Sequence, residues 1–424
     1  MPATGHINIF QPAAHELVKH SHTVYWLTGP AYESSVIATG ATFIPFSPAC
    51  MGAFLPALST DQTRHGTGLS AAIATLIEIF VSPVPHVIDQ YQEILKDFKA
   101  DILLVDLCSL PALVLRELGG PRYATLSVNP FVTLVPEIPP WGSSHFPATT
   151  WLGKMLNWIQ HLIANWLVLS KVNDALNIER AKLGLSEPLR GIDAYPKCSI
   201  SRDLHMVPTT MAFEFPRKGV GEHVKFVGPL MPLMGEGWKR PKWWREVVNA
   251  EEEGLNIVHV TQGTFATASQ NLIKPTIEAL AGEDDVLLVV TTPDAEKLNE
   301  QMKIPQNVRI EKWLPHQELL KNVKVMITNG GYGGVLTALS FGVPLVGAGL
   351  TEDKAMVNSR IAWSGAGIDL KTNTPGSRKI REAVRKVLDN PKYKRVAMRI
   401  QEDFAKHNGA ETVCESLEHC ANNQ

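Results

Sequence analysis

The chain has few of the features that mark several large protein classes. It has five cysteines among 424 residues and no Cys-x-x-Cys pair, so we expect reduced thiols rather than disulfides or a cysteine-held zinc site. It has no Asp-x-Asp pair and no histidines four residues apart on a helix, so we expect no metal. Its formal charge of −2 argues against a nucleic-acid partner.

Long hydrophobic runs and a leader sequence are also lacking. Residues 1–7 have neither a basic start nor an apolar run, as a signal peptide would. The most lipophilic stretch, 155–169, is shorter than the roughly 20 residues that a spanning helix needs, and four polar side chains interrupt it. We therefore expect no transmembrane segment and a cytoplasmic protein.

What the chain does have is a repeated alternation of strands and helices. Apolar runs typical of buried strands alternate with segments of helical spacing in both halves, which indicates parallel sheets covered by helices. Its length and its 45% hydrophobic content suit two domains, which we place at 1–234 and 254–407, with a polar connection at 235–253 and a tail at 408–424. The strands are predicted at 23–28, 42–46, 101–105, 123–128, 198–201, 257–261, 286–290, 308–310, 325–328 and 343–347.

The first domain lacks a strand before its first helical segment. In a doubly wound domain a buried strand precedes the turn that here carries His6, and only five residues come before that histidine. Because this first strand lies in the middle of the sheet, its absence predicts unpaired edges on both neighbouring strands. Two explanations stay open: the sequence is shortened, or the chain has lost the element.

A glycine-rich turn follows the strand predicted at 325–328. The turn contains Gly330, Gly331, Gly333 and Gly334, and a helical segment then runs to Gly342. Such a turn lets backbone N–H groups approach an anion, and the start of a helix adds partial positive charge, so a phosphate is the natural ligand. A tight connection in any parallel sheet is the alternative.

Two further segments flank this turn. Trp313 lies sixteen residues before Asn329, in KWLPHQELL, and the triplet Glu352-Asp353-Lys354 follows the next strand. In this order the segments resemble the donor site of UDP-dependent glycosyltransferases of family 1, particularly the bacterial and fungal branch that modifies macrolides and sterols. The resemblance covers nearly the whole chain. It implies an α/β protein with two facing Rossmann-like domains (the GT-B fold) and a final helix that returns to the first domain.

The same resemblance implies roles for individual residues. His6, in Gly5-His6-Ile7-Asn8, matches the catalytic base, and Asp106, at the end of a predicted strand, matches its orienting carboxylate. Without the resemblance, a single histidine near the terminus would be an exposed bystander. The residues implied to bind UDP are Gly263, Thr264, Trp313, Leu314, His316, Asn329, Gly330, Gly331, Gly333 and Gly334, and those implied to bind the sugar are Glu352, Asp353 and Lys354.

Some positions depart from the family pattern or have a structural alternative. Asn329 replaces the commoner histidine of the turn, and Thr337 replaces the glutamate that holds the ribose, so ribose binding is in doubt or remodelled. Trp313 would serve packing if it lay against Pro315, and the charged triplet would need no role as a surface cluster. The tryptophans of the central insertion are either packed core or a lid over a lipophilic acceptor: Trp141, Trp151, Trp158 and Trp166.

The sequence thus predicts a monomeric enzyme that transfers a hexose, by default glucose, from its UDP donor to a hydroxyl of a small lipophilic acceptor. The resemblance implies inversion without a metal, and a UDP-sugar co-substrate with no other cofactor. A non-catalytic or truncated nucleotide-binding relative, or a nucleotide-sugar epimerase of the same fold, remains the alternative. A nicotinamide-dependent oxidoreductase is less favoured because the first turn lacks Gly-x-Gly-x-x-Gly.

Overall fold

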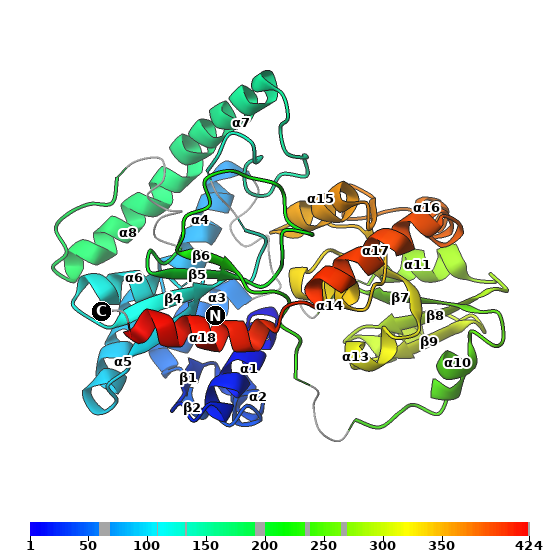
Figure 1. Ribbon diagram of the computed structural model, residues 1–424, viewed down its shortest axis with the longest axis horizontal. Helices are drawn as coiled ribbons and strands as arrows, with labels where there is room; N and C mark the ends of the chain where they lie inside the picture. The colour runs from blue at the N-terminus through cyan, green and yellow to red at the C-terminus, as the bar shows by residue number, and fades with distance from the viewer. Residues whose placement is uncertain are drawn as a thin grey trace.

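Two α/β halves lie side by side in the computed structural model (Figure 1). The structure describes residues 1–58, 68–107, 109–131, 134–190, 200–233, 238–263 and 269–422. Every strand pairing in both halves is parallel. The predicted fold class, parallel sheets covered by helices in two domains, is confirmed.

The second half is built on one continuous sheet. Its strands follow the order β12-β11-β10-β7-β8-β9, and all six residues of β8 are buried, as expected for a parallel strand covered on both faces. The strand order reverses between β7 and β10, and ligands of doubly wound sheets bind beyond the carboxyl ends of such strands. The strands are β7 (Asn256–Thr261), β8 (Val286–Thr291), β9 (Val308–Glu311), β10 (Val323–Thr328), β11 (Leu345–Gly347) and β12 (Gly367–Asp369).

Helices cover both faces of this sheet. One of them, α10, falls within the segment 235–253 expected to connect the domains, yet Trp244 and Val247 are buried in the core of the second half. This part of the connection therefore packs as a piece of the second half. The helices are α10 (Trp244–Asn249), α11 (Ile273–Leu280), α12 (Ala295–Gln301), α13 (His316–Leu319), α14 (Tyr332–Ser340), α15 (Lys354–Ser364), α16 (Ser377–Asp389) and α17 (Pro391–Phe404).

The first half holds two separate sheets. A two-stranded sheet pairs β1 (Tyr25–Thr28) with β2 (Thr42–Pro45), and a four-stranded sheet follows the order β3-β4-β5-β6. Within the described residues no strand pairs with the second edge of β1 or of β3, so the predicted break in the sheet is confirmed. The four strands are β3 (Ile102–Asp106), β4 (Arg122–Leu126), β5 (Leu204–Val207) and β6 (Val224–Phe226).

The strand predicted at 198–201 is wrong where the structure describes it. Ser201 lies in a turn: its hydroxyl donates to the Tyr123 carbonyl and accepts from the backbone N–H of Asp203. This side-chain bonding replaces the ladder of a strand, and β5 begins only at Leu204. Residues 198 and 199 lie outside the described part of the chain.

The helices of the first half surround both sheets, and the final helix α18 (Gly409–Asn422) crosses back from the second half to lie against α1 (Figure 1). The crossing agrees with the expected return of the tail. The helices are α1 (Thr4–Lys19), the short helix η1 (Pro30–Tyr32), α2 (Glu33–Ile37), α3 (Pro48–Leu58), α4 (Leu69–Phe80), α5 (Val84–Asp97), α6 (Leu110–Glu117), α7 (Trp151–Ala164), the π-helical turn η2 (Asn165–Leu169) and α8 (Ser170–Lys182).

One stretch of the described chain, Leu69–Asp97, is long and apolar enough to cross a membrane by those two criteria, with a mean hydropathy of 1.7. It consists of α4 and α5, whose side chains pack with α6 and α8 in an apolar cluster that includes Val84 and Ile88. Core helices pass the same test, so this stretch is weak evidence for a span. The segment 155–169 instead forms most of α7 and the π-helical turn.

A buried charge cluster joins the two halves. Glu214, in the loop between β5 and β6, accepts hydrogen bonds from Arg360 of α15 at 2.6 Å and from Arg217 at 2.7 Å. All three side chains are almost fully buried. The Arg217 guanidinium lies 4.7 Å from the centre of the Phe131 ring, and that of Arg360 lies 4.2 Å from the Phe215 ring. Because its charges are paired and stacked, this cluster holds the halves together away from water.

Candidate functional site

His6 and Asp106 meet at the carboxyl end of β3. His6 lies in the first turn of α1 and Asp106 is the last residue of β3, and the His6 Nδ1 atom is 3.1 Å from Asp106 Oδ2. The carboxylate is 4% exposed and the imidazole 20%, so the ring has solvent on one side. With Nδ1–H donating to the carboxylate, Nε2 holds the lone pair and is able to accept a proton. The structure thus brings together the two residues that the sequence predicted as base and partner.

The Met1 ammonium group shares the same carboxylate. Its nitrogen is 2.6 Å from Asp106 Oδ2, the oxygen that also contacts His6. Burial by itself raises the pKa of Asp106, but the charges of the Met1 ammonium and His6 outweigh burial and hold this pKa far below its usual range. Asp106 is therefore an ionised acceptor, as an orienting carboxylate has to be.

The glycine turn after β10 packs against the side chain of a buried asparagine. Gly330 has a φ of +94°, and a Cβ atom there would lie 2.5 Å from Asn358 Oδ1. Asn358, fully buried in α15, donates from Nδ2 to the Gly349 carbonyl at 3.0 Å. Only glycine satisfies both constraints at position 330. Asn358 could not be predicted from the sequence, because a single asparagine within a helix matches no motif.

The helix that follows this turn presents free backbone donors. Gly331 caps α14, and the first intrahelical bond runs from Val335 N to the Gly331 carbonyl. By helix geometry the N–H groups of residues 332–334 therefore have no partner within the helix. A Cβ atom at Gly333 would meet nothing within 4 Å, so packing does not demand glycine there. The open space and the free N–H groups fit an anion such as a diphosphate.

Asn329 and Gly263 lie at neighbouring strand ends. The Asn329 side chain donates to the Gln262 carbonyl at 2.5 Å and accepts from Gly331 N at 3.3 Å, so it holds the ends of β7 and β10 together. One of its two amide hydrogens is thus engaged within the protein. Gly263 has a φ of +73° with open space around its α-carbon. Thr264, predicted to bind phosphate, lies outside the described residues.

Trp313 is 57% exposed, which contradicts the alternative that it is packed beside Pro315. Its ring is free for stacking, whereas Leu314 next to it is buried and offers its backbone. Stacking of a base on such a ring requires an accessible face, which Trp313 provides.

His316 is half-buried and pairs with the fully buried His259. His259 lies with Nδ1 3.0 Å from the Val289 carbonyl, to which it donates, so its Nε2 accepts from His316 Nε2, 3.3 Å away. Burial lowers the pKa of His259 to about 3 and that of His316 to about 4, so both rings are neutral at pH 7. This bonding assigns the proton of His316 to Nε2 and leaves Nδ1 as an acceptor for a ligand.

The residues predicted to hold the sugar lie at the start of α15. Glu352 and Lys354 form an ion pair, and Asp353 precedes the first residue of the helix. Burial raises the pKa of Asp353 to about 6, against the lowering effect of Lys354 and of His6. His6 therefore lies within electrostatic range of Asp353 although it belongs to the other half, and α1 contacts α14 as well. That the predicted base and the predicted donor residues form one site stays a prediction.

Thr337 departs from the family pattern at the residue that holds the ribose. Its hydroxyl donates to the Gly333 carbonyl at 2.8 Å, within α14 itself. The Thr337 proton is therefore engaged in the helix, and the hydroxyl oxygen is left as an acceptor.

The four tryptophans of the central insertion are exposed, by 38% to 73% of their side-chain surface, so the interpretation as packed core is wrong for them. Helix α7 projects from the first half (Figure 1) and exposes a series of large apolar side chains. A role as a lid stays a prediction. The exposed apolar residues of α7 are Trp151, Leu152, Met155, Leu156, Trp158, Ile159, Leu162 and Ile163.

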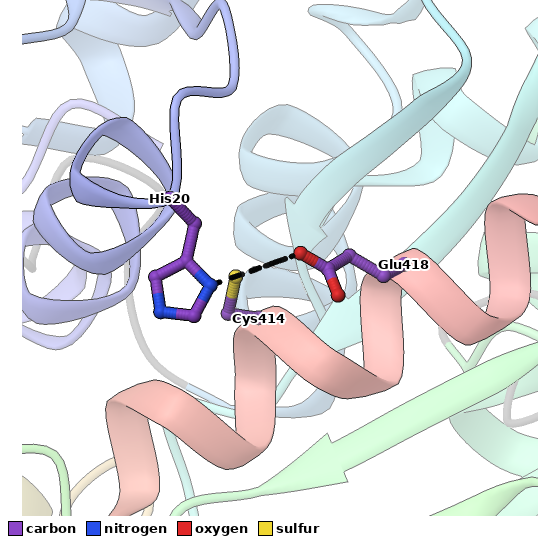
Figure 2. A group of neighbouring side chains, drawn as sticks. All are labelled: His20, Cys414 and Glu418. Atoms are coloured by element: carbon purple, nitrogen blue, oxygen red, sulfur yellow. Dashed lines mark hydrogen bonds and ion pairs between the residues drawn. The ribbon is translucent and has the colours of Figure 1, made fainter.

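One group of side chains in the described part of the chain has spacing that suits a metal: His20, Cys414 and Glu418, with ligand atoms within 4.8 Å of one another. Figure 2 shows His20 on α1's carboxyl end and the other two residues on α18. Glu418 Oε1 also lies 2.8 Å from His22 Nε2. His20 stands fourteen residues beyond His6, about 21 Å along a helix, so this group fastens α1 to α18 and takes no part in the site.

Comparisons with known proteins place these observations in context. A family model described as erythromycin biosynthesis protein CIII-like, C-terminal domain, matches residues 276–420. The 4'-demethylrebeccamycin synthase of Lentzea aerocolonigenes is 35% identical over 98% of this chain and 97% of its own length. UDP-glucosyltransferase B1 of Starmerella bombicola is 29% identical over 96% and 94%.

Solved structures agree with the architecture. The glycotransferase of kitacinnamycin superimposes with a TM-score of 0.76 at 20% identity and covers 99% of this chain and 97% of its own. CalG4, the calicheamicin glycosyltransferase, gives 0.73 at the same identity over 99% and 96%. At such identities the likeness shows the fold alone, and it extends over both halves.

Proposed function

Because this chain belongs to the family 1 glycosyltransferases and has their GT-B fold, we propose that it transfers a hexose from a UDP-sugar to a hydroxyl group of a small lipophilic acceptor. The observation that carries the proposal is the His6–Asp106 pair, partly open to solvent and within electrostatic range of Asp353. A base on the first half then faces a donor bound to the second half.

The chemistry follows from this placement. His6 Nε2 takes the proton of the acceptor hydroxyl, and the Asp106 carboxylate stabilises the imidazolium that forms. The acceptor oxygen forms a bond to the anomeric carbon while the bond from that carbon to the diphosphate breaks. We propose that the acceptor oxygen attacks from the face opposite the leaving diphosphate, which inverts the configuration at the anomeric carbon.

The leaving diphosphate receives its charge stabilisation from the start of α14. The N–H groups of residues 332–334 and the partial positive charge of the helix end are fixed in place before the reaction. We propose that these backbone groups, without a metal or a further cofactor, serve the leaving group. Asp353 and Lys354 then hold the hexose hydroxyls, and Trp313 stacks on the uracil.

The exposed apolar face of α7 supports a lipophilic acceptor, since a helix of this composition gains free energy by contact with apolar molecules. The relatives' names also point to small acceptors, as rebeccamycin and oleandomycin show. Cys50, Cys414 and Cys420 are free thiols, which fits a reducing compartment, so we place the reaction in the cytoplasm.

The test is product formation from UDP-glucose with a mixture of lipophilic alcohols and phenols, followed by mass spectrometry. A parallel reaction with dTDP-glucose covers the second donor class, because the related structure VinC was solved with dTDP. A glycosylated acceptor supports the proposal. A folded protein that consumes no donor and takes up no UDP in calorimetry contradicts it, and donor conversion without acceptor favours an epimerase.

A donor-side variant sharpens this test. Trp313→Ala removes the stacking surface, which contributes about 1–3 kcal/mol per base, so the KM for the UDP-sugar rises about 5-fold to 150-fold. Trp166→Ala is the matched control, because Trp166 is similarly exposed but lies next to α7 in the first half. An unchanged KM in Trp313→Ala refutes the assigned stacking.

A further inference from the structure

Side chains with metal-binding atoms meet where the carboxyl end of α1 lies beside α18. His20 is the C-cap of α1, and His22 follows two residues later. Cys414 and Glu418 are one turn apart on α18 and point towards His20 (Figure 2). The ligand atoms of His20, Cys414 and Glu418 all lie within 4.8 Å of one another. The proposed transfer reaction uses none of these residues, so their meeting calls for another role.

The turn after α1 brings His22 back to α18. The backbone N–H of Ser21 donates to the Val18 carbonyl and that of His22 donates to the Leu17 carbonyl, the two bonds that define a Schellman motif. Ser21 takes the left-handed conformation that this motif needs, with a φ of +67°. The chain therefore turns sharply at Ser21, and His22 Nε2 lies 2.8 Å from Glu418 Oε1.

The distances between the donor atoms suit a tetrahedral zinc ion. Zinc lies about 2.0–2.3 Å from nitrogen, oxygen and sulfur ligands, so two ligands of one tetrahedron are about 3.3–3.7 Å apart. Cys414 Sγ is 3.6 Å from Glu418 Oε1, and His20 Nδ1 is 3.9 Å from the same oxygen. The second distance is too long for a hydrogen bond but close to the spacing of two zinc ligands.

His20 is also oriented as metal-bound histidines usually are. Its other ring nitrogen, Nε2, is 3.2 Å from Oε1 of Glu16, one turn earlier in α1. A carboxylate in this position accepts the hydrogen bond of Nε2–H, which leaves the lone pair on Nδ1, the atom nearer to Glu418. Lys19 Nζ, 2.7 Å from the same Glu16 oxygen, balances the charge of this carboxylate.

Cys414 supplies the donor that distinguishes zinc from calcium and magnesium. It is a fully buried free thiol, and the thiol donates its hydrogen bond to Glu418. Thiolate and imidazole ligands suit zinc, whereas Ca²⁺ and Mg²⁺ prefer oxygen ligands. A Cys414 thiolate and the Glu418 carboxylate together balance the two positive charges of Zn²⁺.

We propose that these side chains bind a structural Zn²⁺ ion that joins α1 to α18. The ligand atoms are His20 Nδ1, Cys414 Sγ and Glu418 Oε1, and His22 Nε2 completes the tetrahedron after its side chain rotates. As the sulfur–zinc bond forms, the Cys414 thiol loses its proton to the solvent.

The sequence-based expectation of no metal rested on local spacing, and ligands from opposite ends of the chain have none. The zinc site does not depend on the proposed function, because it takes no part in the transfer reaction.

The test measures zinc binding by the full chain after dialysis against a chelator. Calorimetry with Zn²⁺ alone gives the dissociation constant and the stoichiometry. Absorption spectra with Co²⁺ alone report the ligands, because a cobalt–thiolate bond gives a charge-transfer band in the near ultraviolet and tetrahedral cobalt absorbs strongly in the visible. This spectrum is measured on the unaltered chain, so it does not depend on the folding of any variant.

Variants then assign the ligands, with circular dichroism as the check that each is folded. Cys414→Ser and His20→Ala each remove a ligand, and His22→Ala removes the fourth. Glu16→Gln keeps all ligands but removes the charge that orients His20. The matched control is Cys420→Ser, which replaces a second thiol of α18.

We expect the unaltered chain to bind a single zinc ion and to show the cobalt–thiolate band. The ligand variants should weaken zinc binding at least about tenfold, and Glu16→Gln about 10- to 100-fold with the band retained. Cys420→Ser should bind as the unaltered chain does. No zinc uptake, a cobalt spectrum without the thiolate band, or equal affinities in Cys414→Ser and Cys420→Ser overturns the proposal. Unchanged affinity in His22→Ala overturns the assignment of the fourth ligand.

Discussion

The two halves of the molecule share a parallel α/β plan and differ at the centre of the sheet. In the second half β7 lies between β8 and β10, and six strands form one sheet. In the first half the corresponding place is a cavity, and six strands form two sheets. In a doubly wound sheet the first strand in sequence is the central one, so its absence divides the sheet instead of shortening an edge. The comparison shows that strand position, and not strand number, decides whether such a sheet is continuous.

The halves also differ in the part of the site that each supplies. Of the proposed site, the first half holds the pair His6 and Asp106, and the second holds the glycine turn and Asp353. Variants on the two sides are therefore expected to separate catalysis from donor binding.

The largest difference between the effect on catalysis and the effect on donor binding is expected for His6→Ala. Loss of a general base lowers kcat by about 10²- to 10⁴-fold, while UDP binding to the second half stays unchanged. Rapid-mixing kinetics and calorimetry with UDP measure the two quantities, and His15→Ala, an exposed histidine of the same helix, is the control. A His6→Ala protein with full kcat would show that the base lies elsewhere.

The contact between the halves is tested by Glu214→Gln. The change leaves Arg217 and Arg360 buried without their carboxylate, so we expect a loss of about 3–5 kcal/mol in the free energy of unfolding. Glu382→Gln, which removes an exposed ion pair with Arg378, is expected to cost less than about 1 kcal/mol. Urea unfolding measures both, and equal effects would contradict the role of the buried cluster.

Two glycines of the same turn are expected to respond differently to alanine. Gly330→Ala forces a side chain into a left-handed backbone and against Asn358, at a cost of about 2–4 kcal/mol in stability. Gly333→Ala meets open space and is expected to leave stability within about 0.5 kcal/mol. Thermal unfolding of the two variants measures both stability costs. An unchanged stability in Gly330→Ala would contradict the left-handed backbone at Gly330 and its contact with Asn358.

The smallest effect is expected from pH. The pKa of Asp353 is raised to about 6, so its carboxylate forms as pH rises from 5 to 7 and then accepts bonds from sugar hydroxyls. The KM for the donor should fall by up to about tenfold over this range and show no such fall in Asp353→Asn. The folded pKa lies above the unfolded one, so this group's contribution to stability is present below about pH 4 and lost as pH rises through 6. A KM for the donor that does not change with pH would show that the Asp353 carboxylate does not bind the sugar.

Local pattern was enough to predict most of the fold and the position of the central residues. His6 and Asp106 were singled out by the resemblance to the family, since periodicity alone would not distinguish a single histidine, and the structure puts them 3.1 Å apart. The break between the two sheets of the first half was also expected, and the strand order confirms it. The strand at 198–201 failed because Ser201 bonds its own turn, which apolar periodicity does not report.

Long-range polar contacts could not be predicted from the sequence. Glu214 and Arg360 are 146 residues apart, and neither belongs to a motif, so nothing in the local pattern indicated that they pair. Asn358 under the glycine turn is a similar case. The central tryptophans show a different limit: composition predicted apolar contact, but burial depends on what else folds over them, and here they are exposed.

The cluster around Glu214 has a mechanical consequence for the whole molecule. Pulling it apart would break the hydrogen bonds of Glu214 with Arg217 and Arg360, and hydration of the exposed charges would offset only part of that loss. A change in the angle between the halves that keeps this cluster intact would alter the distance from His6 to Asp353, whereas a separation of the halves would first have to break the cluster.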